Sequence, residues 1–216
     1  SSGLVRAILI NSGQANACIG DLGNQHFLIA TEKISELLGI KKEEVLMCST
    51  GVIGVPIEID NLVKNLPKLV SELKVNSFQN AAEAILTTDL TVKKVVIERI
   101  IEDRKITIAG LAKGSGMIYP NMATMLAFLT CDAGVEKKEW DKMISIAVKK
   151  SFNAISVDGE TSTNDSFIGI NAGKKINREF LPIIQSGIDI VCKNLAKSIA
   201  RDGEGANCLL EVLVQG

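Results

Sequence analysis

The sequence predicts an α/β or α+β fold in which helices are layered on a largely antiparallel sheet. Segments rich in Val and Ile, separated by turn residues, alternate along the chain with long amphipathic segments typical of helices. The 216 residues are 46% hydrophobic, which is ample material for a buried core. No internal repeat, low-complexity tract or linker interrupts the pattern, so we expect one unit spanning residues 1–216.

Charge and composition exclude several classes of protein. The 24 basic residues nearly balance the 25 acidic ones, which argues against nucleic acid or an anionic membrane as a partner and leaves small neutral or zwitterionic ligands open. The apolar runs are too short to span a membrane, and residues 1–6 lack the pattern of a signal peptide, so we expect a cytoplasmic protein. Five cysteines without a CxxC pair indicate reduced, mostly buried thiols and no zinc site.

The first half of the chain predicts alternating strands and helices. The N-cap of the first helix is expected at Asn24 and its stop at Gly39, and the second helix is expected to break or end near Pro67. The predicted elements are strands at residues 4–10 and 43–47 and helices at 24–38, 57–73 and 77–86.

Three polar segments of this half have two interpretations each. The turn Asn11–Ala17 lines a pocket or makes a tight strand-to-helix connection. The glycine turn Cys48–Gly54 presents backbone N–H groups suited to an oxyanion hole, or is an ordinary turn. Thr87-Thr-Asp89 contacts a ligand or caps a helix.

The second half begins with a hairpin around the turn at residues 102–104 and ends with a helix, a turn and a last strand. In that turn, Asp202-Gly-Glu-Gly205, Glu204 either holds a substrate ammonium or is a solvated carboxylate. The predicted elements are strands at residues 94–101, 105–112, 125–130, 166–170 and 208–214 and helices at 136–152 and 180–200.

A hydroxyl residue, Thr124, stands between the glycine-rich loop that starts at Lys113 and a buried strand. The pattern fits a loop entering a core strand, and it also fits a nucleophile presented to a pocket. The only histidine, His26, falls on a predicted helix face, so catalysis would need another base. Cleavage between Ala123 and Thr124 would give Thr124 a free α-amino group, whose pKa of about 7.7–8.0 suits a general base.

Six segments resemble the motifs of the ornithine acetyltransferase family, also called glutamate N-acetyltransferase, in their order and approximate spacing. The resemblance covers essentially the whole chain. The segments are Ile10–Cys18, Ser49–Gly54, Thr87–Asp89, Ala112–Phe128, Asp158–Asp165 and Asp202–Ala206.

This resemblance implies an αββα-like sandwich of the N-terminal-nucleophile class, cut between Ala123 and Thr124 into pieces 1–123 and 124–216. It implies transfer of an acetyl group from N-acetylornithine to glutamate in arginine biosynthesis, through an acetyl ester of Thr124. The resemblance also implies that Thr50 and Gly51 form the oxyanion hole. The substrate contacts that it implies are Thr87, Lys113, Thr124 and Glu204.

The resemblance also implies which ligands to expect. No metal or cofactor is expected, although acetyl-CoA would be an alternative acetyl donor, and the cleaved pieces are expected to form a homo-oligomer. The family's chain is longer at both ends and supplies a further Asn and Thr for substrate. Two alternatives stay open: an N-terminal-nucleophile amidase or aminopeptidase that passes the acyl group to water, and an uncleaved binding or assembly domain.

Overall fold

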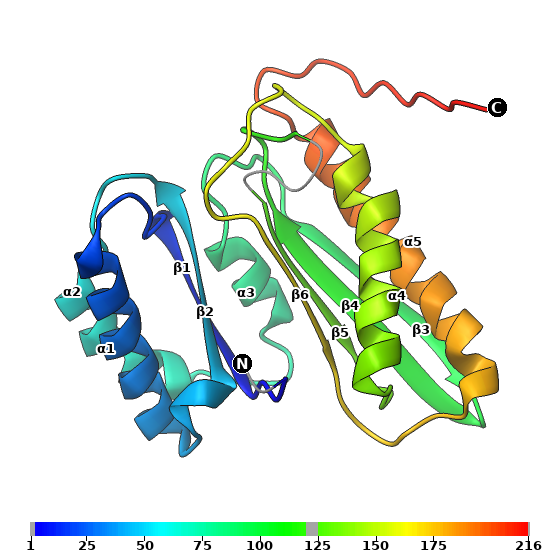
Figure 1. Ribbon diagram of the computed structural model, residues 1–216, viewed down its shortest axis with the longest axis horizontal. Coiled ribbons are helices and arrows are strands. Elements are labelled where there is room, and N and C mark those ends of the chain that lie inside the picture. Colours follow the sequence, from blue (N-terminus) through cyan, green and yellow to red (C-terminus); the bar gives the residue numbers. More distant parts are fainter. Residues whose placement is uncertain (1–2, 120–124, 216) are drawn as a thin grey trace. The chain divides into compact units, whose positions relative to one another are not determined.

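The computed structural model describes residues 3–119 and 125–215 and confirms the predicted α/β class (Figure 1). The chain divides into two compact units, Ser1–Thr87 and Thr88–Gly216. Each unit has helices packed on its own small sheet. The expectation that residues 1–216 act as one catalytic unit concerns function and stays a prediction.

The first unit is built on two parallel strands. Helix α1 makes the crossover that a parallel pair requires, and its buried face packs with both strands and α2 around Leu9, Ile34 and Leu66. The elements are β1 (Ala7–Gln14), α1 (Asp21–Leu38), the 3₁₀ turn Lys42–Glu44, β2 (Val45–Val52), α2 (Ile59–Ser71) and α3 (Phe78–Ala84).

Both strands of this unit run further than predicted. β1 and β2 continue in register through Gln14 and Val52, so parts of both predicted turns are strand instead. The reason is mutual pairing: the two polar segments complete each other's backbone hydrogen bonds, and buried Ser49 Oγ donates to Asn11 Oδ1 at 2.6 Å.

Two helix details were also predicted wrongly. Gly20, not Asn24, is the N-cap of α1, because the helix starts one turn earlier, whereas the stop at Gly39 in the left-handed region is confirmed. Pro67 lies inside α2, which continues to Ser71. A proline removes a single helical hydrogen bond, so one more turn past it is tolerated near a helix end.

The second unit is a four-stranded sheet in the order β3-β4-β5-β6 with two helices on it. The first two pairings are antiparallel, as predicted, and β5 and β6 are parallel because α4 makes the crossover between them. The elements are β3 (Lys93–Ile101), β4 (Arg104–Lys113), β5 (Leu126–Cys131), α4 (Lys137–Lys150), the 3₁₀ turn Phe152–Ala154, β6 (Ser166–Asn171), the 3₁₀ turn Arg178–Phe180 and α5 (Leu181–Arg201).

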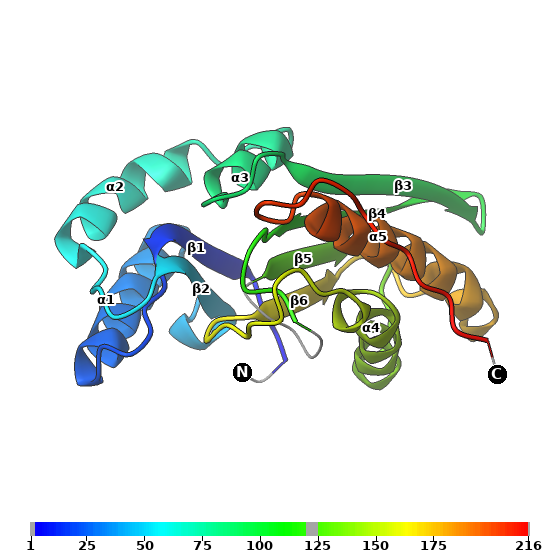
Figure 2. The ribbon, with the colours of Figure 1, turned by 90° about the horizontal axis from the view of Figure 1, so that it is seen from above.

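Helices α4 and α5 lie side by side on one face of this sheet (Figures 1 and 2). The inward face of α5 is fully apolar at Ile184, Ile188 and Leu195, and it packs on β3 and β4. The hydrophobic periodicity predicted both helices because burial of one apolar face is what holds an amphipathic helix on a sheet.

The prediction of a last strand at residues 208–214 is wrong. The segment has no regular structure, and Leu210 and Val214 are more than four-fifths exposed. An alternating sequence becomes a strand only when a partner completes its backbone hydrogen bonds, and none of the residues in the described ranges pairs with it.

The remaining predictions from composition meet mixed outcomes. All five cysteines are free thiols, and Cys48, Cys131 and Cys192 are buried, as predicted, whereas Cys18 and Cys208 are exposed. Within residues 3–119 and 125–215, no helix combines the length and the apolar character needed to cross a membrane.

Candidate active site

Thr50 and Gly51 lie near the end of β2, where they pair with Ser12 and Gly13 of β1. Thr50 is buried, and the φ of +129° at Gly51 is one that favours glycine. A Cβ atom on Gly51 would meet the carbonyl carbon and oxygen of Gly13 at 2.3 Å. The two backbones therefore approach at this point as closely as glycine allows, which fixes the peptide groups on either side.

Replacing Gly51 by alanine is expected to push β1 and β2 apart, because backbone atoms cannot yield as a flexible side chain would. We expect a loss of about 1–3 kcal/mol from the unfavourable φ alone, measured by urea unfolding. Gly54→Ala is the matched control, since Gly54 also has a positive φ but has open space around its Cα. Equal losses in the two variants would contradict the close approach.

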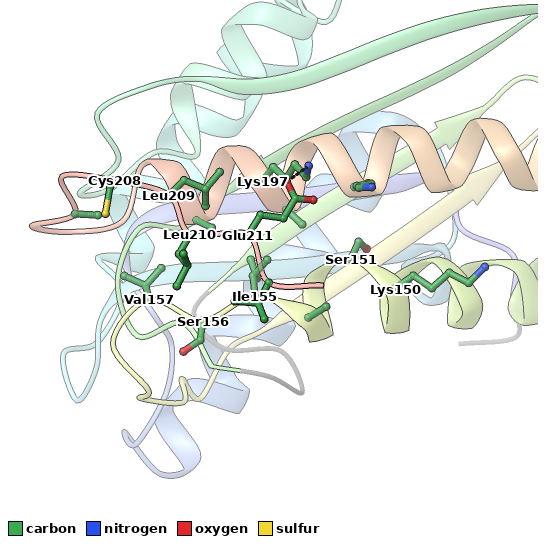
Figure 3. Close-up of a pocket in the computed structure, with 16 residues that line it drawn as sticks. Lys150, Ser151, Ile155, Ser156, Val157, Lys197, Cys208, Leu209, Leu210 and Glu211 are labelled. Carbon is green, nitrogen blue, oxygen red and sulfur yellow. Dashed lines mark hydrogen bonds and ion pairs between the residues drawn. The ribbon is translucent and has the colours of Figure 1, made fainter. Parts of the chain in front are cut away.

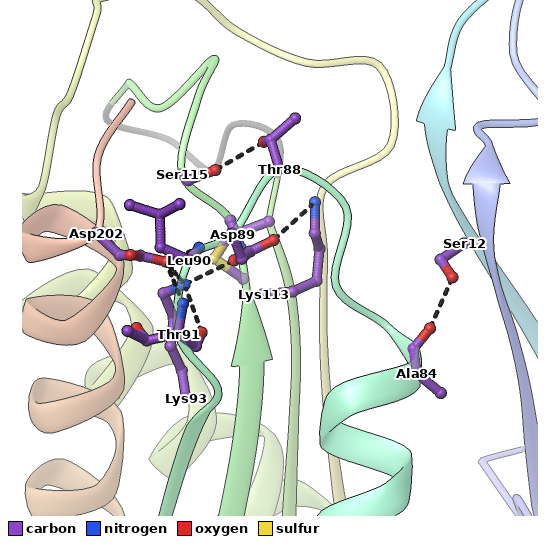
Figure 4. Close-up of polar contacts among 12 residues, drawn as sticks. Ser12, Ala84, Thr88, Asp89, Leu90, Thr91, Lys93, Lys113, Ser115 and Asp202 are labelled. Atoms are coloured by element: carbon purple, nitrogen blue, oxygen red, sulfur yellow. Dashed lines mark hydrogen bonds and ion pairs between the residues drawn. The ribbon is translucent and has the colours of Figure 1, made fainter. Parts of the chain in front are cut away.

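Thr87 follows α3 and is exposed. The end of that helix is tied to β1, because Ser12 Oγ donates to the carbonyl oxygen of Ala84 at 2.6 Å (Figure 4). The first unit thus holds three predicted site residues, Thr50, Gly51 and Thr87, on elements joined by hydrogen bonds.

In the second unit, a buried ion cluster lies where β3 begins and β4 ends (Figure 4). The side chains of Lys93 and Asp89 are fully inaccessible, and Lys93 Nζ donates to Asp89 Oδ1 at 2.6 Å and also to Asp202. Asp202 in turn accepts from the backbone N–H groups of Leu90 and Thr91. Buried charges of this kind are tolerated only when they are paired and hydrogen-bonded.

Lys113 is the last residue of β4 and is 2% exposed. Its Nζ lies 3.8 Å from Asp89 Oδ2. Burial lowers the pKa of the Lys113 ammonium, Asp89 opposes that effect, and the charge of Lys93 adds to it. The sequence-predicted substrate residue is therefore a buried cation with a carboxylate beside it.

Glu204 lies against the turn that follows Lys113. Its backbone N–H donates to the carbonyl oxygen of Ser115 at 2.7 Å, and a Cβ on Gly116 would meet its carboxyl carbon at 2.9 Å. Ser115 is anchored in turn by a hydroxyl–hydroxyl bond of 2.8 Å to Thr88. The structure thus places Glu204 against the turn that follows Lys113, and the cation and the carboxylate together suit a zwitterionic ligand.

Ala123 and Thr124 lie outside the described residues, but Met125, which is covalently bonded to Thr124, is described. Its N–H donates to Asp165 Oδ1 at 2.6 Å, and its carbonyl oxygen accepts from the N–H of Ser166 at 3.0 Å. Both backbone groups of the residue after Thr124 are therefore held by the segment that enters β6.

Asp165 is a third carboxylate near Lys113. Burial raises its pKa to about 6, and the Met125 N–H and Lys113 act in the opposite direction. Within residues 3–119 and 125–215, its Oδ2 atom is buried and has no hydrogen-bond partner. A half-buried carboxylate thus lies next to the start of β5.

Replacing Asp165 by asparagine is expected to change how stability depends on pH. Because the folded-state pKa of about 6 exceeds the ordinary 3.8, the carboxyl favours the folded state below pH 4, and that contribution is lost as the pH rises through 6. The asparagine variant lacks this slope. Since Asp165 keeps part of its solvent contact, we expect about 1 kcal/mol.

Urea unfolding at several pH values between 4 and 7 measures this difference. Asp141→Asn on α4 is the control, because that carboxylate is mostly exposed and pairs with Lys137 at the surface. Free energies that change in parallel for wild type and Asp165→Asn would contradict the prediction.

Sequence reasoning missed Lys93 and the individual roles of Asp89, Asp165 and Asp202. The three aspartates fall inside the motifs quoted above, but their partners could not be assigned from the sequence. Lys93 stands where a strand begins, a position at which lysine is usually solvated. The one available signal is the spacing of Asp89 and Lys93, four residues apart.

A cavity of about 430 Å³ lies elsewhere in the second unit, between the end of α4, α5 and residues 206–212 (Figure 3). Its lining includes three lysines, of which Lys197 pairs with Glu211 at 2.8 Å. None of the predicted site residues in ranges 3–119 and 125–215 lines it. Within the same ranges, no three His, Cys, Asp or Glu side chains are grouped as metal ligands would be.

A family model described as the ArgJ family matches residues 1–216. The chain belongs to the ArgJ family. The resemblance to the ornithine acetyltransferases is thereby confirmed at the level of the family. Membership covers both units, so all six motifs lie within the ArgJ match.

Curated relatives from cyanobacteria are similar over the whole chain. The "Arginine biosynthesis bifunctional protein ArgJ" of Prochlorococcus marinus subsp. pastoris is 79% identical over 216 residues, covering 100% of this chain and 54% of that protein. ArgJ 1 of Nostoc sp. is 48% identical over 217 residues, covering 98% of this chain and 52% of that protein. This ArgJ-family chain thus spans about half the length of the curated relatives that it matches.

Two solved ArgJ-type structures are also similar. The arginine biosynthesis bifunctional protein argJ of Bacillus halodurans is 36% identical, with 54% of this chain and 61% of that chain covered and a TM-score of 0.49. Ornithine acetyltransferase of Mycobacterium tuberculosis, complexed with ornithine, is 32% identical, with 53% and 61% covered and a TM-score of 0.47.

Proposed function

We propose that this chain is the catalytic part of an enzyme that moves an acetyl group from N-acetylornithine to glutamate through an acetyl ester of Thr124. Family membership over residues 1–216 supports the reaction. The observation that carries the proposal is local: Glu204 packs against the turn that follows Lys113, and Lys113 pairs across the sheet with Leu126, two residues after Thr124.

The proposed activation is a self-cleavage. The Thr124 hydroxyl oxygen attacks the Ala123 carbonyl carbon, the C–N bond to Thr124 breaks, and the nitrogen takes the proton, which leaves an ester and a free α-amine. Water then hydrolyses the ester, so that Ala123 ends in a carboxylate and Thr124 regains its hydroxyl. The new α-amine of Thr124 serves as the general base, a role for which the single histidine, His26, is poorly suited because it lies on a helix.

The transfer itself uses the same hydroxyl twice. Thr124 attacks the acetyl carbonyl of N-acetylornithine while its α-amine takes the proton, the amide C–N bond breaks, and ornithine leaves with the proton. The amino group of glutamate then attacks the acetyl ester and restores the hydroxyl. Hydrogen-bond donors at Thr50 and Gly51 would stabilise the negative oxygen that forms in each step, and losing one such donor typically costs roughly 10²–10³ in rate.

Charge complementarity supports the substrate class. N-acetylornithine and glutamate both carry α-carboxylate groups, and the Lys113 ammonium is suited to bind one of them. The carboxylate of Glu204 is suited to an ammonium group, and Thr87 would add a hydroxyl. The word bifunctional in the relatives' names supports a second activity, for which we propose acetyl-CoA as donor. We also propose that the cleaved pieces assemble into a homo-oligomer.

An assay of the full-length protein with N-acetylornithine, with and without glutamate, tests the function. We expect N-acetylglutamate and ornithine in equal amounts, and a mass spectrum in which the fragment that begins at Thr124 carries one acetyl group when glutamate is absent. Acetate released equally with and without glutamate would identify a hydrolase instead. An intact chain with no acetyl adduct would identify a non-catalytic domain.

A further inference from the structure

Asp89 is shared between two buried lysines. Its Oδ1 atom accepts from Lys93 Nζ and from the N–H of Gly114, both at 2.6 Å, while its Oδ2 atom faces Lys113 Nζ at 3.8 Å (Figure 4). The Asp89 carboxylate therefore holds the backbone just after β4, at Gly114, and also faces the ammonium group of Lys113 at the end of that strand.

The two lysines do not depend on Asp89 equally. Lys93 has a second carboxylate, Asp202, bound to the same Nζ atom. Lys113 has Glu204 and Asp165 nearby as further charges that stabilise its ammonium, but Glu204 is exposed and Asp165 is only half-buried. Asp89, whose side chain is inaccessible to water, is thus the least screened of these three carboxylates.

We propose that Asp89 is a positioning residue that keeps Lys113 protonated and in place to receive the carboxylate of an amino-acid substrate. The inference rests on the proposed function for the role of Lys113. Lys93 and Asp202 support this role of Asp89. The Lys93 ammonium, held between the two aspartates, stabilises the ionised form of Asp89 inside the protein. The cluster of two lysines and two aspartates is neutral, which is how four charges can share one buried place.

The test is Asp89→Asn in the full-length protein. Asparagine keeps one carbonyl oxygen that can accept from Gly114 and Lys93, and it replaces the negative oxygen that faces Lys113 by an uncharged amide nitrogen. We expect KM for N-acetylornithine to rise roughly 10- to 100-fold at pH 8, with a smaller change in kcat. The defect should shrink as the pH falls towards 6.5, because a larger share of Lys113 is then protonated.

The matched control is Glu98→Gln. Glu98 also pairs with a lysine of β4, Lys105, at 2.8 Å, but both side chains are more than half exposed. This variant should leave KM and its pH dependence unchanged. The proposal would be overturned if the KM of Asp89→Asn matched that of wild type at every pH. It would also be overturned if the changes in kcat and KM were the same at pH 6.5 as at pH 8.

A second readout needs no substrate. In protein labelled with ¹³C at the lysine ε-carbon, the resonance assigned through Lys113→Arg reports the charge of Lys113 during a pH titration. Asp89→Asn should move that titration to lower pH. An unmoved titration overturns the inference even if the enzyme transfers acetyl groups, whereas a moved titration in a protein without transferase activity supports it and rejects the proposed function.

Discussion

Thr124→Ala is expected to leave the chain uncut and to abolish acetyl transfer. Both reactions use the same hydroxyl oxygen as nucleophile, and no water molecule can take its place in the first, because the first step is an intramolecular attack on the preceding carbonyl. We expect transfer to fall by roughly 10⁴-fold or more. Mass spectrometry of the denatured protein checks the cleavage, and an N-terminal sequence beginning Thr-Met-Leu-Ala-Phe identifies the cut in wild type.

Thr130→Ala is the matched control for this variant. Thr130 lies on β5, six residues further along the chain, is exposed, and donates a long hydrogen bond of 3.4 Å to the Ala109 carbonyl oxygen. It should cleave and transfer as wild type does. A Thr124→Ala protein that still yields two fragments would remove Thr124 from the mechanism.

Lys93→Met is expected to be the most destabilising single change in the buried cluster. It keeps the length of the side chain but leaves the Asp89 and Asp202 carboxylates buried without their shared cation. Removing one partner of a buried ionic group typically costs about 3–5 kcal/mol. Urea unfolding at pH 7 measures this loss.

Lys94→Met provides the comparison, because Lys94 is the next residue of β3 and is exposed. It should change stability by no more than about 0.5 kcal/mol. Adding Asp202→Asn to Lys93→Met should recover part of the loss, because one uncompensated charge is then gone. Equal stability of the two methionine variants would show that the cluster contributes little.

Local patterns predicted much of the fold. The hairpin of β3 and β4 followed from Val and Ile on either side of a short polar turn, and Glu102 and Asp103 indeed adopt the positive φ of such a turn. Helices α1, α4 and α5 followed from apolar residues at helical spacing. These features depend on residues close together in the chain, which is why a sequence reveals them.

Features that depend on distant partners were missed. Asn11 and Ser49 were predicted to lie in turns. They lie in strands because β1 and β2 pair there, and this pairing joins residues 38 positions apart in the sequence. The pairing of Lys93 with Asp202 spans 109 residues, and only the spacing from Asp89 distinguishes Lys93 in the local sequence from its solvated neighbour. The candidate site could be predicted only as separate motifs, and the contacts that hold its buried charges needed the fold.

The sheet order of the second unit decides what a cut before Thr124 would leave behind. β3 and β4 come before the cut and β5 and β6 after it, yet β5 lies between β4 and β6 and pairs with β4 from Ile108 to Lys113. The two pieces would therefore share one sheet and one core. Cleavage would expose a new amine without releasing either fragment, so the nicked protein should purify as a single particle and come apart only in denaturant.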